Sequence, residues 1–429
     1  MRPCSRPSRS VPRAGEPALS HAGAGRYSPA VSRPPLYLDY SATTPVRPEV
    51  LAAMLPYFSE KFANPSSVHA AGIEANQGVG MARRTLAAIV GTPPTGVVFT
   101  AGGTEADVLA LRGAMRAAEA AGPAPAGMRR SIVLSAVEHH AVLETARCME
   151  GEGAEARIVP VDPDGCVDPA AVADCVDAGT VLVSIMHVNN ETGAVQPVAE
   201  LSRLVKQRNP DTLVHVDAVQ SFGRYRVSFA EWPDVDLISV AAHKIYGPKG
   251  VGALFVRPGT KLAPIITGGG QEHGLRSGTH NVPGIVGLAE AARLLDLTRE
   301  ADMAHYAALA TRFLDGLAAR LPEAHHLNGA RDETPPYARR APYIVNVCFR
   351  GAPTEALHGA LSAAGISVSA GSACHSKDGG PSHVLCAMGT GEGACLRFSI
   401  GRPTSEADME RVLDAVVGAL TKLRVPTRA

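Results

Sequence analysis

The sequence contains no run approaching eighteen consecutive apolar residues, so it offers no candidate for a transmembrane helix. Its eight cysteines form no C-x-x-C pair and are thinly spread, which argues against a disulfide scaffold or a zinc site and favours a reducing compartment. Basic and acidic residues balance at 41 each, so the composition gives no electrostatic signature of nucleic-acid or membrane binding. The length of 429 residues favours two domains.

Residues 1–35 differ from the rest of the chain in composition. They are rich in arginine and proline and contain a single acid, Glu16. This composition is typical of a disordered tail or of a start codon placed too early, and Arg-rich, acid-poor segments also occur as organelle transit peptides. We therefore expect a cytoplasmic protein, or a mitochondrial one if this segment is a transit peptide.

From Leu36 onward, apolar runs alternate with helical patterns. Expected strands are residues 97–100, 131–136, 180–188, 212–217, 235–242 and 252–256, and expected helices include 105–121 and 198–208. Nearly continuous apolar strands that alternate with helices predict an α/β fold with a mainly parallel sheet. We expect this large domain at 47–300. A smaller α+β domain is expected from 300–429 plus 36–46, with a helix at 301–321 and strands at 343–349 and 366–370.

A glycine turn joins one of these strands to a helix in the segment TAGGTEADVLALRG (100–113). Free backbone N–H groups at the start of a helix bind phosphate, and the hydroxyl of Thr104 could contribute a further hydrogen bond. Gly102 and Gly103 could equally form only a tight turn.

Asp217 and Lys244 both follow apolar strands. The carboxyl ends of parallel strands carry the ligand sites of such sheets, so the two side chains are expected to meet there. A buried carboxylate needs a cationic partner such as a protonated pyridine nitrogen, although a helix cap or an ion pair would also explain Asp217. The chain has only seven lysines, and only Lys244 lies between a strand and a glycine turn. A desolvated lysine at that position could form a Schiff base.

Two histidines follow the strand at 131–136. His139 or His140 could stack on an aromatic ring and transfer protons, or be an ordinary structural histidine.

Ten segments in order resemble the cysteine desulfurases, which are fold-type I pyridoxal-phosphate enzymes related to the class V aminotransferases. The segments are YLDYSATTPV (37–46), NPSSVH (64–69), FTAGGTEAD (99–107), SIMHVNNETG (184–193), HVDAVQS (215–221), HKIYGPKG (243–250), GGGQE (268–272), RSGT (276–279), AGSACHS (370–376) and RFSIGR (397–402). The resemblance extends from about Leu36 to Lys422 and leaves out only the ends.

The resemblance implies pyridoxal 5'-phosphate as the cofactor and a role for each matched residue. Lys244 would form the Schiff base, Asp217 would pair with the pyridinium nitrogen, and His139 would stack on the ring. Gly103, Thr104 and His243 would hold the phosphate. The remaining implied contacts are Asn190 and Gln220 at the phenolic oxygen side, Thr279 at the phosphate of a partner subunit, and Arg397 at the substrate carboxylate. A homodimer follows from the role of Thr279.

Cys374 matches the catalytic cysteine of that family, and its small and polar neighbours are typical of a surface loop. The implied reaction converts L-cysteine to L-alanine and leaves a persulfide on Cys374. The sulfur would then pass to an iron–sulfur scaffold or a tRNA-thiolation protein. Cys148 and Cys348 have apolar neighbours in the sequence and are expected to serve packing, whereas Cys386 and Cys395 are left open.

The sequence departs from the family pattern before His243, where Ala241 and Ala242 replace the common Ser and Gly. The missing hydroxyl predicts slightly weaker retention of the cofactor.

Two other functions remain open at this point. Selenocysteine lyases share several of these motifs, and a catalytically inactive partner in a sulfur-transfer assembly is an alternative of another class.

Overall fold

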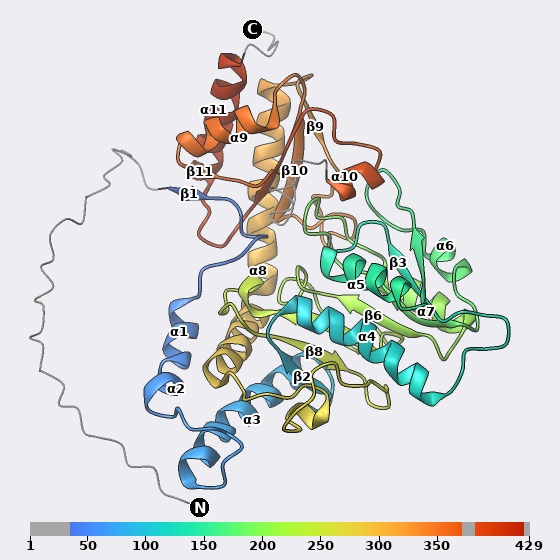
Figure 1. Ribbon diagram of the computed structural model, residues 1–429. Coiled ribbons are helices and arrows are strands. Elements are labelled where there is room, and N and C mark those ends of the chain that lie inside the picture. Colours follow the sequence, from blue (N-terminus) through green and yellow to red (C-terminus); the bar gives the residue numbers. More distant parts are fainter. Residues whose placement is uncertain (1–34, 371–381, 424–429) are drawn as a thin grey trace, which may run out of the picture. The chain divides into compact units, whose positions relative to one another are not determined.

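The computed structural model describes residues 35–370 and 382–423, which belong to one compact unit (Figure 1). Residues 1–35, expected to form a tail, lie outside the described residues except for Pro35. Within the described ranges, no helix combines the length and apolarity that a membrane crossing requires.

The main sheet confirms the predicted α/β fold. Its strand order is β2-β8-β7-β6-β5-β3-β4. The strands are β2 (Val97–Thr100), β3 (Ser131–Ser135), β4 (Glu155–Val159), β5 (Thr180–Ser184), β6 (Leu213–Asp217), β7 (Leu237–Ala241) and β8 (Gly252–Val256). The neighbours from β4 to β7 are parallel, and β8 runs antiparallel to both β7 and β2.

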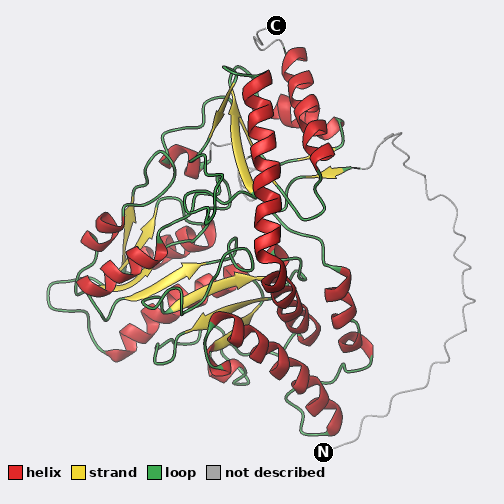
Figure 2. Cartoon of the chain, turned by 180° about the vertical axis from the view of Figure 1, so that it is seen from behind, coloured by secondary structure: helices red, strands yellow, loops and turns green. Residues whose placement is uncertain are grey.

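Helices cover both faces of this sheet (Figure 2). The helices are α1 (Pro48–Met54), α2 (Pro56–Ser59), α3 (Ala70–Val90), α4 (Gly103–Ala121), α5 (His140–Gly151), α6 (Pro169–Asp174), α7 (Val198–Arg208), α8 (Val282–Arg320), α9 (Thr354–Ala363), α10 (His383–Ala387) and α11 (Glu406–Lys422), with the 3-10 turns η1 (Pro94–Gly96), η2 (Ala242–Lys244) and η3 (Glu272–Gly274). Residues from α4 and α5 pack on one face, and residues from α3, α7 and α8 pack on the other.

Successive side chains of each strand point to opposite faces of the sheet and therefore pack in two different apolar cores. Leu182 of β5 packs with α4 and α5, whereas Val183 packs on the opposite face. Successive side chains of a strand point to opposite faces, so a strand covered on both sides must be apolar at nearly every position. This explains the continuous apolar runs of the sequence.

The ends of the helices follow local signals. The α3 helix ends at Gly91, whose φ of 70° is the left-handed conformation that glycine adopts at low cost. At the other end of the chain, α11 starts with a reciprocal capping box between Ser405 and Asp408. Such signals fix helix ends without tertiary information.

Two smaller sheets form around a separate apolar core. One pairs β1 (Leu36–Tyr37) with β11 (Ile366–Ser367), and the other has the order β12-β10-β9, with β9 (His325–Leu327), β10 (Ile344–Phe349) and β12 (Ala394–Ser399). Their core contains residues of β1 as well as of the C-terminal segment. The expected domain boundary at residue 300 lies inside α8, which contacts α1 and α3 at one end and α11 at the other (Figure 1). The division into two domains stays a prediction.

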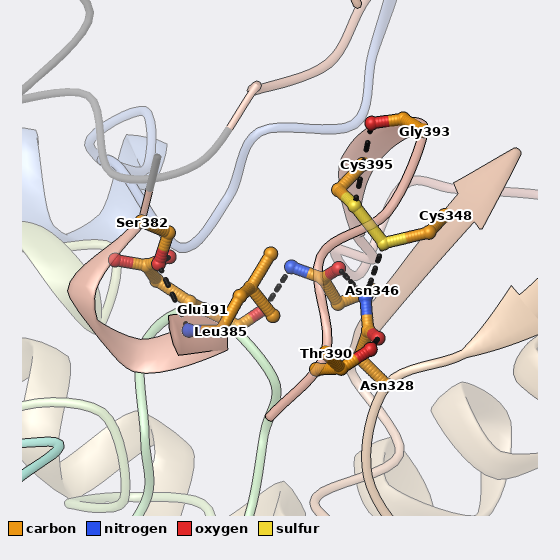
Figure 3. The surroundings of a disulfide bond; sticks show 9 residues. All are labelled: Glu191, Asn328, Asn346, Cys348, Ser382, Leu385, Thr390, Gly393 and Cys395. Carbon is orange, nitrogen blue, oxygen red and sulfur yellow. Dashed lines mark hydrogen bonds between the residues drawn. A yellow bond between two sulfur atoms is a disulfide. The ribbon is translucent and has the colours of Figure 1, made fainter. Parts of the chain in front are cut away.

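A disulfide joins Cys348 of β10 to Cys395 of β12 (Figure 3). The two residues lie directly opposite each other in the antiparallel ladder. Asn328 donates hydrogen bonds to Cys348 Sγ at 3.0 Å and to Asn346 Oδ1 at 2.7 Å, and α10 packs against the same pair. Cys348 is buried in an apolar cluster, as expected of a packing residue, but its disulfide was not expected from the sequence. Strand register, which is not visible in a local pattern, brings the two thiols together.

Candidate active site

A cavity of about 250 Å³ opens beside the carboxyl ends of β6 and β7. Asp217 is the last residue of β6, and Lys244 ends the 3-10 turn that follows β7. The cavity is lined by nine of the predicted site residues: Gly103, Thr104, His139, Asn190, Asp217, Gln220, His243, Lys244 and Arg397. The structure thus brings together side chains that are almost 300 positions apart in the sequence, and their individual roles stay predictions.

The N-terminus of α4 forms one end of the cavity. Its N-cap residue, Gly102, provides no side-chain cap, so the backbone N–H groups of the first turn remain available to an anion. A Cβ on Gly103 would lie 2.7 Å from Val219 Cγ2, so any larger residue there would force Val219 to move. His243 Nδ1 lies 3.2 Å from Thr43 Oγ1, which fixes the imidazole at the same end. This end is suited to a phosphate group.

Asp217 and His139 are placed to contact a ring held in the middle of the cavity. The backbone N–H of Val219 donates to Asp217 Oδ1 at 2.9 Å. Burial raises the pKa of Asp217 to about 6, whereas the Val219 hydrogen bond and the positive Lys244 act in the opposite direction. His139 is the N-cap of α5, and its Nδ1 accepts the N–H of Ala141. Burial, followed by the charge of Lys244, lowers the pKa of His139 to about 4, so the imidazole is neutral.

Lys244 extends its amino group toward the segment after β1. Its Nζ donates to the carbonyl oxygens of Ser41 and Ala42, the latter at 2.9 Å. Burial is the main cause that lowers its pKa to about 8, and nearby Arg397 acts in the same direction. A lowered pKa increases the fraction of neutral amine near neutral pH, and the neutral amine is the form that attacks an aldehyde.

Arg397 enters the cavity from β12 and is only 2% exposed. Its guanidinium donates to Asp39 Oδ1 at 2.6 Å and to the carbonyl oxygen of Asn190 at 2.8 Å, whereas its buried Nε has no hydrogen-bond partner among the described residues. Asp39 was not singled out as a site residue, although it belongs to the recognised segment 37–46. Its role as the partner of Arg397 depends on a contact across 358 positions.

Thr279 and Cys374 are the remaining predicted site residues. Thr279 is exposed and does not line it, which is compatible with a contact to a partner subunit. Cys374 lies outside the described residues. Of the other cysteines, Cys148 and Cys386 are exposed, so the expectation that Cys148 is a packing residue was wrong.

The sequence did not point to two buried acids near the cavity, Asp107 and Glu138. Asp107 of α4 lines the cavity and is 1% exposed. Glu138, next to His139, is fully buried and accepts hydrogen bonds from Ser135 Oγ and from the backbone N–H of Met186. Asp107 lies four positions after Gly103, and that helical spacing was the available signal that it faces the same side as the glycine turn.

The residues present fit pyridoxal phosphate. An uncapped helix N-terminus matches the phosphate, Asp217 matches a pyridinium nitrogen, and Lys244 matches the aldehyde. Gln220 Nε2 donates to the carbonyl oxygen of Ser41, but its buried Oε1 has no partner within the described residues and is available to a ligand. The phosphate, the ring nitrogen and the aldehyde of the cofactor therefore each have a complementary group in the cavity.

Comparisons with known proteins agree with this geometry. The aminotransferase class-V family model matches residues 36–412. "Cysteine desulfurase IscS" of Dictyoglomus turgidum is 40% identical over 91% of this chain and 95% of its own length, and the protein of that name from an Anaeromyxobacter species is 43% identical over 91% and 93%. Among solved structures, a "NifS-like protein" has a TM-score of 0.81 at 36% identity and covers 90% of this chain and 100% of its own. A structure described as "SspA in complex with cysteine" has a TM-score of 0.72 at 32% identity, covering 85% and 98%. With pyridoxal phosphate as its cofactor, the chain belongs to the class V aminotransferase family and, within it, to the cysteine desulfurases.

Proposed function

We propose that the chain converts L-cysteine to L-alanine and transfers the sulfur to its own Cys374. The observation that carries the proposal is the single cavity in which Lys244, Asp217 and Arg397 face one another. A lysine of lowered basicity, a carboxylate and a guanidinium match the aldehyde and pyridine nitrogen of the cofactor and the carboxylate of an amino acid. One of the related solved structures holds cysteine.

Lys244 and Asp217 are proposed to carry the proton chemistry. Bound pyridoxal phosphate withdraws electrons from the bonds at the substrate Cα. Lys244 would take the proton from the substrate Cα, and its pKa of about 8 suits both removal and return of a proton near neutral pH. Asp217 keeps the ring nitrogen protonated, because its carboxylate stabilises the positive charge there.

Arg397 is proposed to bind the substrate carboxylate. Asp39 and the carbonyl oxygen of Asn190 hold the guanidinium in the cavity, so its orientation is set before substrate arrives. Its planar donor group binds a carboxylate through two parallel hydrogen bonds.

The sulfur transfer step is assigned to Cys374 on the strength of the family pattern. Its thiolate attacks the substrate sulfur, so a sulfur–sulfur bond forms while the substrate carbon–sulfur bond breaks. The electron pair of the broken bond stays on the carbon skeleton, which takes up a proton and leaves as L-alanine. The persulfide is then available to an acceptor protein, for which an iron–sulfur scaffold and a tRNA-thiolation protein are the proposed classes.

A homodimer is proposed as the active form. Thr279 is exposed, as a residue that reaches the phosphate of a partner subunit must be in the isolated chain. In addition, Leu51, Leu55, Phe58 and Phe62 of the α1–α2 region are 47–72% exposed and recur every three or four positions; we refer to these four residues as the ridge. Several large apolar side chains exposed on one short segment favour an interaction site there.

The dimer predicts a sedimenting mass of twice the 44.5 kDa of one chain. Leu55→Glu is expected to shift the protein toward monomer, because a charge would be buried without a partner. Leu297→Glu, at a leucine of α8 that lies outside the ridge and is 71% exposed against 55% for Leu55, is the control. Dissociation of the control but not of the ridge variant would place the interface elsewhere.

Ala241→Ser is expected to tighten cofactor binding about fivefold, since one neutral hydrogen bond contributes about 1 kcal/mol. Ala241 lines the cavity, and its Cβ is 3.5 Å from the position that a Cβ on Gly103 would occupy, so a hydroxyl there would face the phosphate end. Fluorescence titration of the apoprotein measures the dissociation constant. Pyridoxal without its phosphate is the control ligand, for which no gain is expected, and an unchanged constant for the phosphate form contradicts the idea.

The test of the proposed function is the release of alanine and sulfide from L-cysteine in the presence of a reductant. Equal amounts of the two products support the desulfurase. Turnover restricted to L-selenocysteine would favour a selenocysteine lyase instead. A cofactor-loaded protein inert toward both substrates would favour the catalytically inactive partner.

A further inference from the structure

A buried polar layer lies beneath Asp217, on the face of the main sheet that α4 covers. It consists of Ser184 of β5, His215 of β6, Ser239 of β7 and Asp107 of α4. All four are at most 1% exposed. Two positions earlier on the three strands, the same face carries leucines 182, 213 and 237, which pack in the apolar core with α4 and α5. Polar side chains inside such a core are costly unless they are hydrogen-bonded, so the layer calls for a physical explanation.

His215 forms the centre of the layer. Its Nδ1 lies 2.8 Å from Ser184 Oγ and its Nε2 lies 2.8 Å from Ser239 Oγ. Burial lowers the pKa of His215 to about 3, so the ring is neutral and carries one proton. Asp107 Oδ1 lies 3.7 Å from Nε2 and has no hydrogen-bond partner among the described residues, although the carboxyl also interacts with Ser239. A neutral imidazole cannot balance the charge of a buried carboxylate.

Asp107 also shares the cofactor cavity with Asp217. Among the described residues, the charged and titratable groups that face it are Asp217 and His215 of β6 and Glu138 after β3, and none of these is a cation. Burial, and then the charge of Asp217, raise the pKa of Asp107 well above its usual range, whereas Asp217 is balanced by Lys244. When two buried carboxyl groups share one nearby cation, the state in which only one of them is ionised is favoured over the state in which both are.

We propose that Asp107 is a positioning residue that stays protonated in the folded protein and thereby leaves Asp217 as the only anion available to the cofactor's ring nitrogen. This inference rests on the proposed contact between Asp217 and the cofactor. A protonated Asp107 donates to Ser239, whose hydroxyl then donates to His215 Nε2, while Nδ1–H donates to Ser184. The protons of Asp107, Ser239 and His215 then each have an acceptor.

The first test measures the thermal unfolding of the apoprotein for wild type and Asp107→Asn between pH 5 and pH 8. The folded wild type keeps a proton that the unfolded chain releases above the ordinary carboxyl pKa of about 4, so its stability falls as pH rises. Asparagine has no such proton. The variant's melting temperature relative to wild type is therefore expected to rise by about 5 °C over this range. A constant offset, or a relative fall, overturns the proposal.

The second test compares the pyridoxal-phosphate dissociation constants of Asp107→Asn and Asp217→Asn apoproteins at pH 7.5. Asparagine mimics a protonated acid, so the first variant is expected to stay within about threefold of wild type and the second to lose more than about tenfold. The reverse order places the anion on Asp107 and overturns the proposal. Equal retention in both variants instead refutes the proposed cofactor contact of Asp217, while the unfolding series still reports on Asp107.

A third measurement covers the case in which Asp107→Asn does not fold. The infrared carbonyl band of a protonated carboxyl is recorded for the Glu138→Gln apoprotein at pH 7.5. This background removes Glu138, because burial also raises its pKa, to about 8. A remaining band from a buried acid is expected, and its absence overturns the proposal.

Discussion

Replacing Lys244 by alanine is expected to abolish covalent attachment of the cofactor and to lower the rate of sulfide release by roughly 10²–10⁴-fold or more. The lysine has two proposed tasks, attachment to the aldehyde and proton transfer at Cα, and no other lysine of the described ranges lines the cavity. Borohydride reduction followed by peptide mass spectrometry locates the attached cofactor, and product release gives the rate.

Lys249→Ala is the matched control for this experiment. Lys249 lies in the exposed turn that follows Lys244, so its replacement removes the same charge from the neighbourhood without changing the cavity. It is expected to retain attachment and turnover. Covalent cofactor on a residue other than Lys244 in the wild type would refute the assignment, and with it the proposed proton transfer.

Replacing Cys374 by alanine is expected to lower sulfide and alanine release by a factor on the order of 10³ or more, because the group that accepts the substrate sulfur is gone. Cofactor binding should persist, since the cavity residues that fit the cofactor are unchanged. The same product assay, together with the visible absorbance of the bound cofactor, separates the two effects. Persulfide trapped by alkylation on the Cys374 peptide of the wild type provides direct support.

Cys386→Ala is the control, because Cys386 is an exposed thiol of α10 that follows the Cys374 segment in the chain. Full activity in this variant and loss in Cys374→Ala would identify the nucleophile. The opposite result would move the persulfide to Cys386, and equal activity in both variants would contradict a protein-bound persulfide at either position.

Local pattern was enough to predict the parts of the fold that depend on local physics. Continuous apolar runs between helical segments predicted β2, β3, β5, β6, β7 and β8, because strands buried on both faces have no room for polar side chains. Strand β4 was missed. It lies at the edge of the sheet, and Glu155 and Arg157 interrupt its apolar pattern. The first half of α8 was also missed, since a helix was predicted only at 301–321.

The sequence by itself determined the class of fold, the family and the residues at the carboxyl ends of β6 and β7, since strand position and residue type suffice to place Asp217 and Lys244 at one edge of the sheet. Tertiary structure alone decided the pairing of Arg397 with Asp39, the joining of Cys348 to Cys395, and the meeting of Asp107 with His215 below the cavity. These contacts depend on strand register and on the packing of a helix over a sheet. Both are set by burial across the whole unit, so no short segment of sequence contains them.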